Sequence, residues 1–212
     1  MKTTRIWILI ISKIISQHFL ERVDWKTDLH FQTQTTIDTL DYSGTGLNQG
    51  SKVIIAAAGP QKRQLMVLVP TDLSLPQGFK HPTIAMPGVM VIETSPFSDI
   101  QTADTEIEAL VQKLGALAKR DEMPLVVLVD DAEFAARSLN NFLWTTFTRS
   151  NPSHDIYGVN SFTKFKHWGC EFLLIIDARL KPHHAPPLVE DSKIKSRVDE
   201  MGKRGGCLYG II

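Results

Sequence analysis

Several short runs of apolar residues, without polar alternation, predict strands that are covered on both faces. Residues 52–58, 125–129 and 172–177 form such runs, and each is too short to make a helix. Between Pro70 and Pro96 the spacing of proline and glycine permits only short extended pieces, of which residues 89–93 are the best candidate.

Apolar residues recur at helical spacing in the segments between these runs. One predicted helix starts at Thr102 or Asp104, either of which can cap it, and its C-terminal end lies near Lys119 and Arg120. Others are predicted over residues 138–148 and, as an exposed helix, over 192–201. Helices that alternate with apolar strands predict an α/β fold with an open, largely parallel or mixed sheet flanked by helices.

The first nineteen residues differ from the rest of the chain. Residues 6–11 are all apolar and follow Lys2 and Arg5, which resembles a secretory signal. However, Lys13 interrupts the run, no small-x-small cleavage site follows, and the stretch is far short of the ~20 apolar residues that span a bilayer. The pattern favours a short packed or frayed helix over a signal or anchor. We therefore divide the chain into an N-terminal segment, 1–19, and one domain, 20–212.

The amino-acid composition limits which partners the chain is expected to bind and which cellular compartment it is expected to occupy. Lys plus Arg and Asp plus Glu number 23 each, so the basic footprint of a nucleic-acid-binding protein is missing. Cys170 and Cys207 lie far apart, unlike the paired cysteines of a zinc knuckle or a redox dithiol. We expect two reduced thiols in a cytoplasmic protein that neither binds nucleic acid nor spans a membrane.

Two carboxylates mark a possible ligand site. Asp130 and Asp131 follow the apolar run 125–129, and ligands and metal ions gather at the carboxyl ends of strands in open α/β sheets. Paired carboxylates at a strand end also cap the next helix or pair with an arginine such as Arg137 or Arg149. The sequence favours this structural use.

Other polar motifs do not predict a site. The glycine-rich stretch 44–52 reads Gly-Ser-Lys and precedes a strand, whereas a phosphate-binding loop follows a strand and opens a helix. His154, His167, His183 and His184 lack the spacing that lets two imidazoles converge on a metal, and the last two point apart if the chain is extended. The adjacent residues 153–155, Ser-His-Asp, are a polar helix exit and not a catalytic triad.

Residues 157–170 mix aromatic, basic and glycine residues, which predicts an irregular connection before a buried strand. Loops rich in aromatic residues often line pockets. A loop packed in the core, or an interface between subunits built on Phe162, Phe165 and Trp168, explains the composition equally well.

Several separate stretches together resemble the C-terminal region of UbiD-family decarboxylases. The resemblance begins near Leu20, and its strongest motifs are residues 30–42, 127–131, 140–156, 165–170, 177–179 and 181–187. It is greatest to the longer homologues associated with bacterial menaquinone-type quinone biosynthesis. Phe172 departs from the pattern, because a small residue is expected there, and it could alter a turn.

The resemblance implies decarboxylation of aromatic or α,β-unsaturated acids by prenylated FMN, together with manganese and potassium. In the family these groups, the catalytic acid and its arginine belong to preceding domains, and no stretch of this chain matches them. We therefore expect no catalytic, cofactor-binding or metal-binding residue in this chain. By position the resemblance assigns a substrate wall to five residues, Tyr157, Phe162, Phe165, His167 and Trp168.

Two hypotheses follow. The first is a truncated or separately encoded C-terminal domain of a UbiD-like carboxy-lyase that supports assembly, contributes part of the substrate wall and is inactive alone. The second is a non-catalytic oligomerisation module that docks onto a separate flavin-binding partner. Both predict either a homo-oligomer or a complex with the missing flavin-binding portion. A third, weaker hypothesis is a free-standing ligand-binding domain at Asp130 and Asp131.

Overall fold

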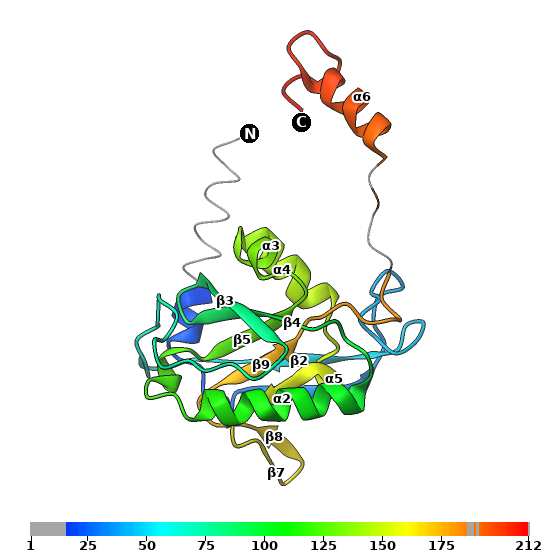
Figure 1. Ribbon diagram of the computed structural model, residues 1–212. Helices are drawn as coiled ribbons and strands as arrows, with labels where there is room; N and C mark the ends of the chain where they lie inside the picture. The colour runs from blue at the N-terminus through cyan, green and yellow to red at the C-terminus, as the bar shows by residue number, and fades with distance from the viewer. Residues whose placement is uncertain (1–15, 186–188, 190, 212) are drawn as a thin grey trace.

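A computed structural model describes residues 16–185, 189 and 191–211. Its centre is a five-stranded mixed sheet with the strand order β3-β4-β5-β9-β6 (Figure 1). Strands β4, β5 and β9 are parallel, whereas the edge strands β3 and β6 are antiparallel to their neighbours. The strands are β3 Phe79–Met86, β4 Val89–Thr94, β5 Leu125–Val129, β9 Leu174–Asp177 and β6 Ile156–Gly158. The predicted α/β fold with a largely parallel or mixed sheet is confirmed.

Alternate side chains of β5 pack into different layers. Val127 and Val129 join a cluster with residues of α3 (Ala132–Ala136) and α4 (Leu139–Thr148). Val126 and Leu128 point the other way and pack with α2 (Ile100–Gly115). Figure 1 shows α2 on one side of the sheet and α3 and α4 on the other. The strand is apolar throughout because both of its faces are covered.

Helix α2 starts earlier than predicted. The carboxylate of Asp99 accepts a hydrogen bond from the backbone N–H of Thr102 at 2.9 Å, so Asp99 is the cap and the assignment to Thr102 or Asp104 is wrong. An extended aspartate with a negative charge suits a helix N-terminus. The helix ends at Gly115, and Arg120 begins a separate 3-10 turn, η1 (Arg120–Glu122).

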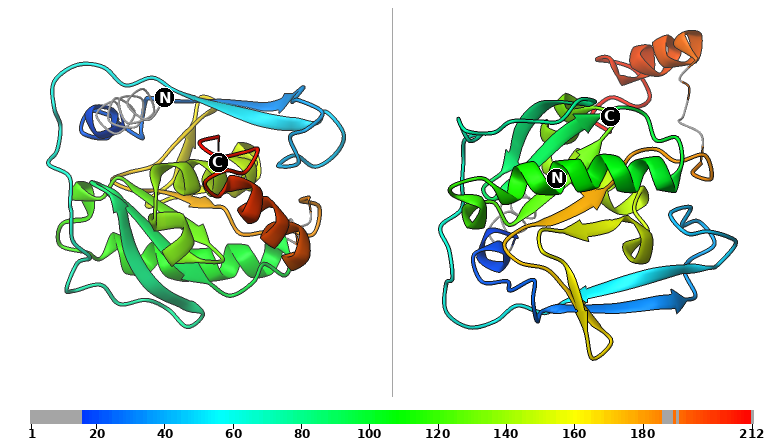
Figure 2. Two further views of the ribbon diagram at one scale, coloured as in Figure 1. Left: turned by 90° about the horizontal axis from the view of Figure 1, so that it is seen from above. Right: turned by 60° about the horizontal axis from the view of Figure 1, so that its bottom comes forward.

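The prediction of a strand covered on both faces at residues 52–58 is wrong. This segment contributes to β2 (Gly50–Ile55), which pairs antiparallel with β1 (Leu29–Thr35) in a separate two-stranded ribbon (Figure 2). Val53 is half-buried whereas the next residue, Ile54, is 53% exposed. Only one face of the ribbon packs against the rest of the domain. The apolar run therefore belongs to a strand that is covered on one face and exposed on the other.

The predicted irregular connection at 157–170 is also wrong, because it contains regular structure. After β6 the chain forms a hairpin of β7 (Phe162–Lys164) and β8 (His167–Gly169). Phe165 and Lys166 at its tip have φ values of 51° and 65°. Hairpin turns with positive φ at both central residues usually carry Asn-Gly or Gly-Gly. Phe-Lys gives no such signal, which is why the hairpin was not predicted.

Phe172 does occupy an unusual turn, as its departure from the family pattern suggested. Its φ is 61°, in the left-handed region that non-glycine residues seldom adopt. The guanidinium of Arg120 lies 4.3 Å from the centre of its ring. This cation–π contact helps to hold a bulky residue where a small one would be easier to place.

The C-terminal helix α6 (Ser192–Gly202) confirms the predicted exposed helix, and none of its residues is buried. Figure 1 shows it apart from the sheet. Of the N-terminal segment 1–19, residues 1–15 lie outside the described residues, and 16–20 are helical. No helix in the described part of the chain is long and apolar enough to cross a membrane. Cys170 and Cys207 are both free thiols.

Candidate functional site

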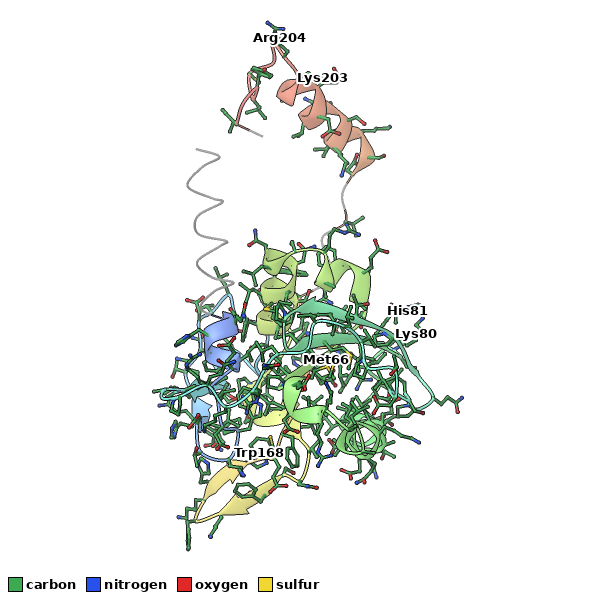
Figure 3. The ribbon with its side chains drawn as sticks, turned by 90° about the vertical axis from the view of Figure 1, so that its left-hand side faces the viewer. Met66, Lys80, His81, Trp168, Lys203 and Arg204 are labelled. Atoms are coloured by element: carbon green, nitrogen blue, oxygen red, sulfur yellow. The ribbon has the colours of Figure 1, made fainter. Side chains whose placement is uncertain are left out.

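A groove of about 480 Å³, here called the aromatic groove, lies between β1, α5 (Pro152–Asp155) and the β7–β8 hairpin. Figure 3 shows Trp168 where this hairpin meets the body. The groove is lined by Leu29, His30, Phe31, Thr33, Pro152, Ser153, Ile156, Phe165, Lys166, His167 and Trp168. It therefore combines segments that are more than a hundred residues apart in the sequence.

Direct contacts fix two of the aromatic side chains in this groove. The ring of Trp168 meets that of Phe31 edge to face, with 5.5 Å between the ring centres. Nε2 of His167 lies 2.9 Å from the carbonyl oxygen of Lys26, to which it donates as the N–H tautomer. Strand β8 thus presents rings whose orientation is set by β1 and by the turn before it.

Gly169 allows the hairpin to lie this close to the body. A Cβ atom at this position would stand 2.9 Å from the carbonyl oxygen of Trp25 and 3.0 Å from that of Lys26. Both contacts are with backbone, which cannot move aside as a flexible side chain can. Because Gly169 has no side chain, β8 can lie directly against the backbone of residues 25 and 26.

The aromatic groove has the chemistry of a binding surface for an aromatic anion. His30, Lys166 and His167 bring nitrogen groups to it, and its lining residues include no carboxylate. Ser153 Oγ lies 2.8 Å from Nδ1 of His154, so this hydroxyl already has a partner. Aromatic faces can stack on a ring while a lysine attracts a carboxylate. Such a surface can orient an aromatic anion by stacking and by charge.

The five predicted wall residues do not all meet. Phe165, His167 and Trp168 line the aromatic groove together, although Phe165 is 92% exposed at the hairpin tip. Tyr157 lies elsewhere, and its hydroxyl donates to the Asp104 carboxylate at 2.8 Å. Phe162 is not among the groove residues either. Sequence position alone could not show that Tyr157 and the hairpin face different sides.

A second concentration of polar groups lies at the carboxyl ends of the parallel strands. Arg179, 1% exposed, holds the Asp177 carboxylate with both Nε and Nη2, at 3.0 and 2.9 Å. Its Nη1 donates to Glu106 of α2 at 2.9 Å and to the carbonyl oxygen of Ser95 at 3.1 Å. These ion pairs raise the pKa of Arg179, although burial opposes them. The guanidinium therefore ties β9 to α2.

Lys181 is the second buried cation of this cluster. Its ammonium donates to the carbonyl oxygens of Asp177 at 2.9 Å, Arg149 at 3.2 Å and Arg179 at 3.4 Å. It also pairs with the Asp155 carboxylate at 3.3 Å. Burial raises the pKa of Asp155, and the charge of Lys181 opposes that shift. Because these groups satisfy one another, they form a structural clamp between β9, α4 and α5.

Asp130 and Asp131 have the structural roles that the sequence favoured. Asp131 caps α3 by accepting a hydrogen bond from the Phe134 N–H at 2.8 Å. Asp130 pairs with Arg149 at 2.9 Å and accepts from the Leu180 N–H at 2.8 Å. Each carboxylate therefore already has a structural partner. Both residues also line an open hollow of about 680 Å³, so a ligand site at this strand end stays a prediction.

His183 and His184 do not point apart, contrary to the expectation for an extended chain. Residues 182 and 183 form a turn, and the two rings meet edge to face with 4.6 Å between their centres. Burial, with the positive charge of Lys181 next, lowers the pKa of His184 to about 4. Its Nδ1 accepts from the Lys181 N–H at 3.1 Å, so the ring is neutral and helps to shape the loop.

Arg179, Lys181, Asp155 and His30 were not predicted as site residues. The only local signal was the charged triplet at 177, 179 and 181, where alternate residues after an apolar strand fall on one side of an extended chain. No comparable signal marks His30, whose ring stands 6.1 Å from that of His167 across the groove.

The described residues do not fit the metal that the resemblance implies. No group of three or more histidine, cysteine, aspartate or glutamate side chains among them could hold a metal ion. The strand-end carboxylates already serve as a helix cap and an ion-pair partner. Hard cations such as manganese need several oxygen ligands at one point. We therefore derive no chemical step of this chain through a metal.

Comparison with known proteins gives the resemblance an independent basis. The family model of the 3-octaprenyl-4-hydroxybenzoate carboxy-lyase (UbiD) C-terminal domain matches residues 12–57. Over these residues the chain is similar to the C-terminal domain of the UbiD family. One relative, from Chlamydia pneumoniae and described as a subunit of 4-hydroxybenzoate decarboxylase, is 29% identical over 195 residues, or 88% of this chain and 30% of the relative.

Other comparisons show how much of its relatives' length the chain covers. An uncharacterized protein of Chlamydia trachomatis serovar D is 32% identical over 190 residues, which cover 84% of this chain and 29% of that protein. The chain thus spans about 30% of the length of these relatives. A solved structure of the Sedimentibacter hydroxybenzoicus vanillic acid decarboxylase shows 17% identity and a TM-score of 0.32 over 54% of this chain and 26% of that one, a likeness too slight to argue from.

Proposed function

We propose that this chain is the C-terminal assembly and substrate-wall domain of a UbiD-like decarboxylase. The complete enzyme would use prenylated FMN, manganese and potassium on an aromatic or unsaturated acid, in cytoplasmic quinone biosynthesis of the menaquinone or ubiquinone type. The sequence relatives support the family, and the relative described as part of a decarboxylase supports the reaction class. The observation that carries the role of this chain is the aromatic groove.

The groove suits an aromatic carboxylate because of its charge and its shape. Trp168 and Phe31 offer aromatic surface, while Lys166 offers a cation at the edge of the hairpin. A carboxylate on the ligand would meet no like charge among the lining residues. Decarboxylation also requires an acid or base, a cofactor and the substrate to meet within hydrogen-bonding reach. We assign orientation of the ring to this groove and assign the chemistry to the flavin-binding portion.

The alternative function is a non-catalytic oligomerisation module that docks onto a separate flavin-binding partner. It is favoured by the exposed apolar side chains of α3 and α4, since Phe134 is 36%, Trp144 51% and Phe147 62% exposed. Aromatic residues on a surface are typical of interfaces. Assembly of this kind would not require the aromatic groove to face a substrate.

Reconstitution separates the two functions. The chain is mixed with a UbiD-family decarboxylase that lacks its C-terminal domain and carries prenylated FMN, manganese and potassium. Release of carbon dioxide from 4-hydroxybenzoate and complex formation are then measured. Restored turnover supports the substrate-wall proposal, association without turnover supports the module, and absence of association contradicts both.

A matched pair of variants tests the groove within the restored complex. Lys166 lines the groove and Lys164, two residues earlier on the same hairpin, does not. Lys166→Gln should raise the KM for the acid by roughly tenfold, because a charge-assisted contact is lost. Lys164→Gln should leave the KM unchanged. Equal effects of the two substitutions would show that the groove does not contact the substrate.

A further inference from the structure

Helix α6 carries an apolar stripe that its own chain leaves uncovered. Ile194, Val198 and Met201 follow one another at spacings of four and three residues, so they lie along one side of the helix. All three are exposed, and Figure 1 shows the helix apart from the rest of the domain. A helix of 11 residues is marginally stable alone in water, and packing of its apolar side is what normally stabilises it. The stripe therefore indicates a surface against which α6 packs.

The chain exposes a second apolar surface on α3 and α4. Four exposed side chains form it, and they are here called the apolar face: Phe134, Leu143, Trp144 and Phe147. The rings of Phe134 and Trp144 meet edge to face with 6.2 Å between their centres. The guanidinium of Arg149 lies 5.0 Å from the centre of the Trp144 ring. These contacts orient the ring of Trp144 before any partner binds, which lowers the entropy lost on binding.

The two surfaces carry net charges of opposite sign. Residues 192–211, which contain α6 and the turns after it, have five lysines and arginines and two carboxylates. Residues 130–149, which contain α3 and α4, have three carboxylates and two arginines. Asp130 pairs with Arg149 and Glu133 with Arg137, so the excess negative charge lies on Asp131 at the start of α3. Charge therefore favours contact of α6 with α3 and α4 over contact of either surface with its own kind.

We propose that two copies of this chain exchange α6, so that the stripe of each helix packs on the apolar face of the other copy. Each copy supplies both surfaces, so the two contacts are identical and close as a dimer with two-fold symmetry. A monomer leaves both surfaces in water, whereas the exchange covers both at once. The inference deepens the assembly role proposed above and rests on it, because it names the surfaces through which copies of the chain would assemble.

Sedimentation velocity of the full chain tests the stripe with a matched pair of substitutions. Val198 belongs to the stripe, whereas Ser196 is exposed on the opposite side of the helix. Val198→Asp should raise the dissociation constant of the dimer by about tenfold or more, because it places a carboxylate in an apolar contact. Ser196→Asp adds the same charge to the same helix and should leave the constant unchanged. Equal effects of the two substitutions, or an unsubstituted chain that is monomeric at every concentration, would overturn the proposal.

A substitution on α4 tests the other half of the contact. Trp144→Ser removes the largest ring of the apolar face and should weaken the dimer about as strongly as Val198→Asp. If Trp144→Ser fails to fold by circular dichroism, Phe147→Ser replaces it. A dimer that responds to these α4 substitutions but not to Val198→Asp would be joined face to face, which would refute the exchange of helices.

Disulfide trapping shows which copy supplies the helix. All chains carry Cys207→Ser, because Cys207 is exposed, whereas Cys170 is buried. Val198→Cys chains are mixed with longer, tagged Trp144→Cys chains and oxidised. Exchange should give a mixed covalent dimer, and Ser196→Cys in place of Val198→Cys should give much less of it.

A single chain that carries both Val198→Cys and Trp144→Cys distinguishes exchange from docking within one copy. Exchange joins two such chains, whereas a disulfide-closed monomer would show that α6 packs on its own α4 and would overturn the proposal. These experiments use the chain alone, without flavin or a second protein. Their failure would therefore exclude helix exchange, while the reconstitution separately tests the decarboxylase role.

Discussion

The clamp around Lys181 gives the sharpest prediction about stability. Lys181→Met keeps an unbranched chain of similar length but removes the ammonium that bonds three carbonyl oxygens and pairs with Asp155. Both partners of the ion pair are buried, at 5% and 6% exposure. Removing one partner of a buried pair typically lowers the free energy of unfolding by about 3–5 kcal/mol. For a chain of this size that corresponds to a fall in Tm of roughly 6–20 °C.

The loss of unfolding free energy in Lys181→Met should depend on pH in a defined direction. Burial raises the pKa of Asp155 in the folded chain. At a pH between the unfolded and the folded pKa, the native state therefore binds more protons than the unfolded state, and its stability falls as the pH rises. Without Lys181 the folded pKa of Asp155 rises further. The variant should therefore be most destabilised at neutral pH, and its deficit should shrink as the pH falls through that raised pKa.

Urea denaturation at pH 7 and pH 5 measures both effects, with Lys164→Met on the exposed hairpin as the control. The double variant Lys181→Met with Asp155→Asn should recover part of the loss, because the amide leaves no unpaired buried charge. A loss below about 1 kcal/mol at pH 7, typical of an exposed pair, would refute the clamp. So would a deficit that grows as the pH falls.

Three further outcomes follow from local geometry. Asp131→Ala removes the cap of α3 and should lower the unfolding free energy by about 1 kcal/mol in urea denaturation; no loss would show that the cap is dispensable. Gly158→Ala would place a Cβ 2.3 Å from that of Cys170 and should cost about 1–3 kcal/mol, whereas an unchanged Tm would mean that β6 can shift. Cys207 should react readily with a thiol-reactive disulfide, and Cys170 only on unfolding, because Cys170 is buried and burial raises its thiol pKa to about 12. Equal rates for the two thiols would contradict this.

The main sheet could be predicted because its sequence signals are local. The all-apolar run 125–129 is β5 without a change of boundary, and Ser138 caps α4 where the periodic pattern begins. The ribbon and the hairpin could not be predicted in the same way. Residues 52–58 look like a buried strand although only one face is covered, and Phe165-Lys166 lacks the residues that usually mark a tight turn.

The candidate site was predicted only in part for a different reason. His167 and Trp168 were assigned to the substrate wall by the family resemblance, but His30 and Phe31 reach the same groove from the far end of the sequence. Their meeting depends on how the ribbon packs, which no local pattern encodes. Tyr157 shows the converse, since a residue close in sequence to the hairpin faces another part of the molecule.

The charged segment at 177–181 also determines how the chain would respond to a protease. Arg179 and Lys181 anchor it to α2, α4 and α5 through contacts that all lie before residue 185. Helix α6 beyond it offers trypsin exposed sites at Lys193 and Arg197. Limited digestion should therefore trim the C-terminal helix first and leave a core fragment that still melts cooperatively.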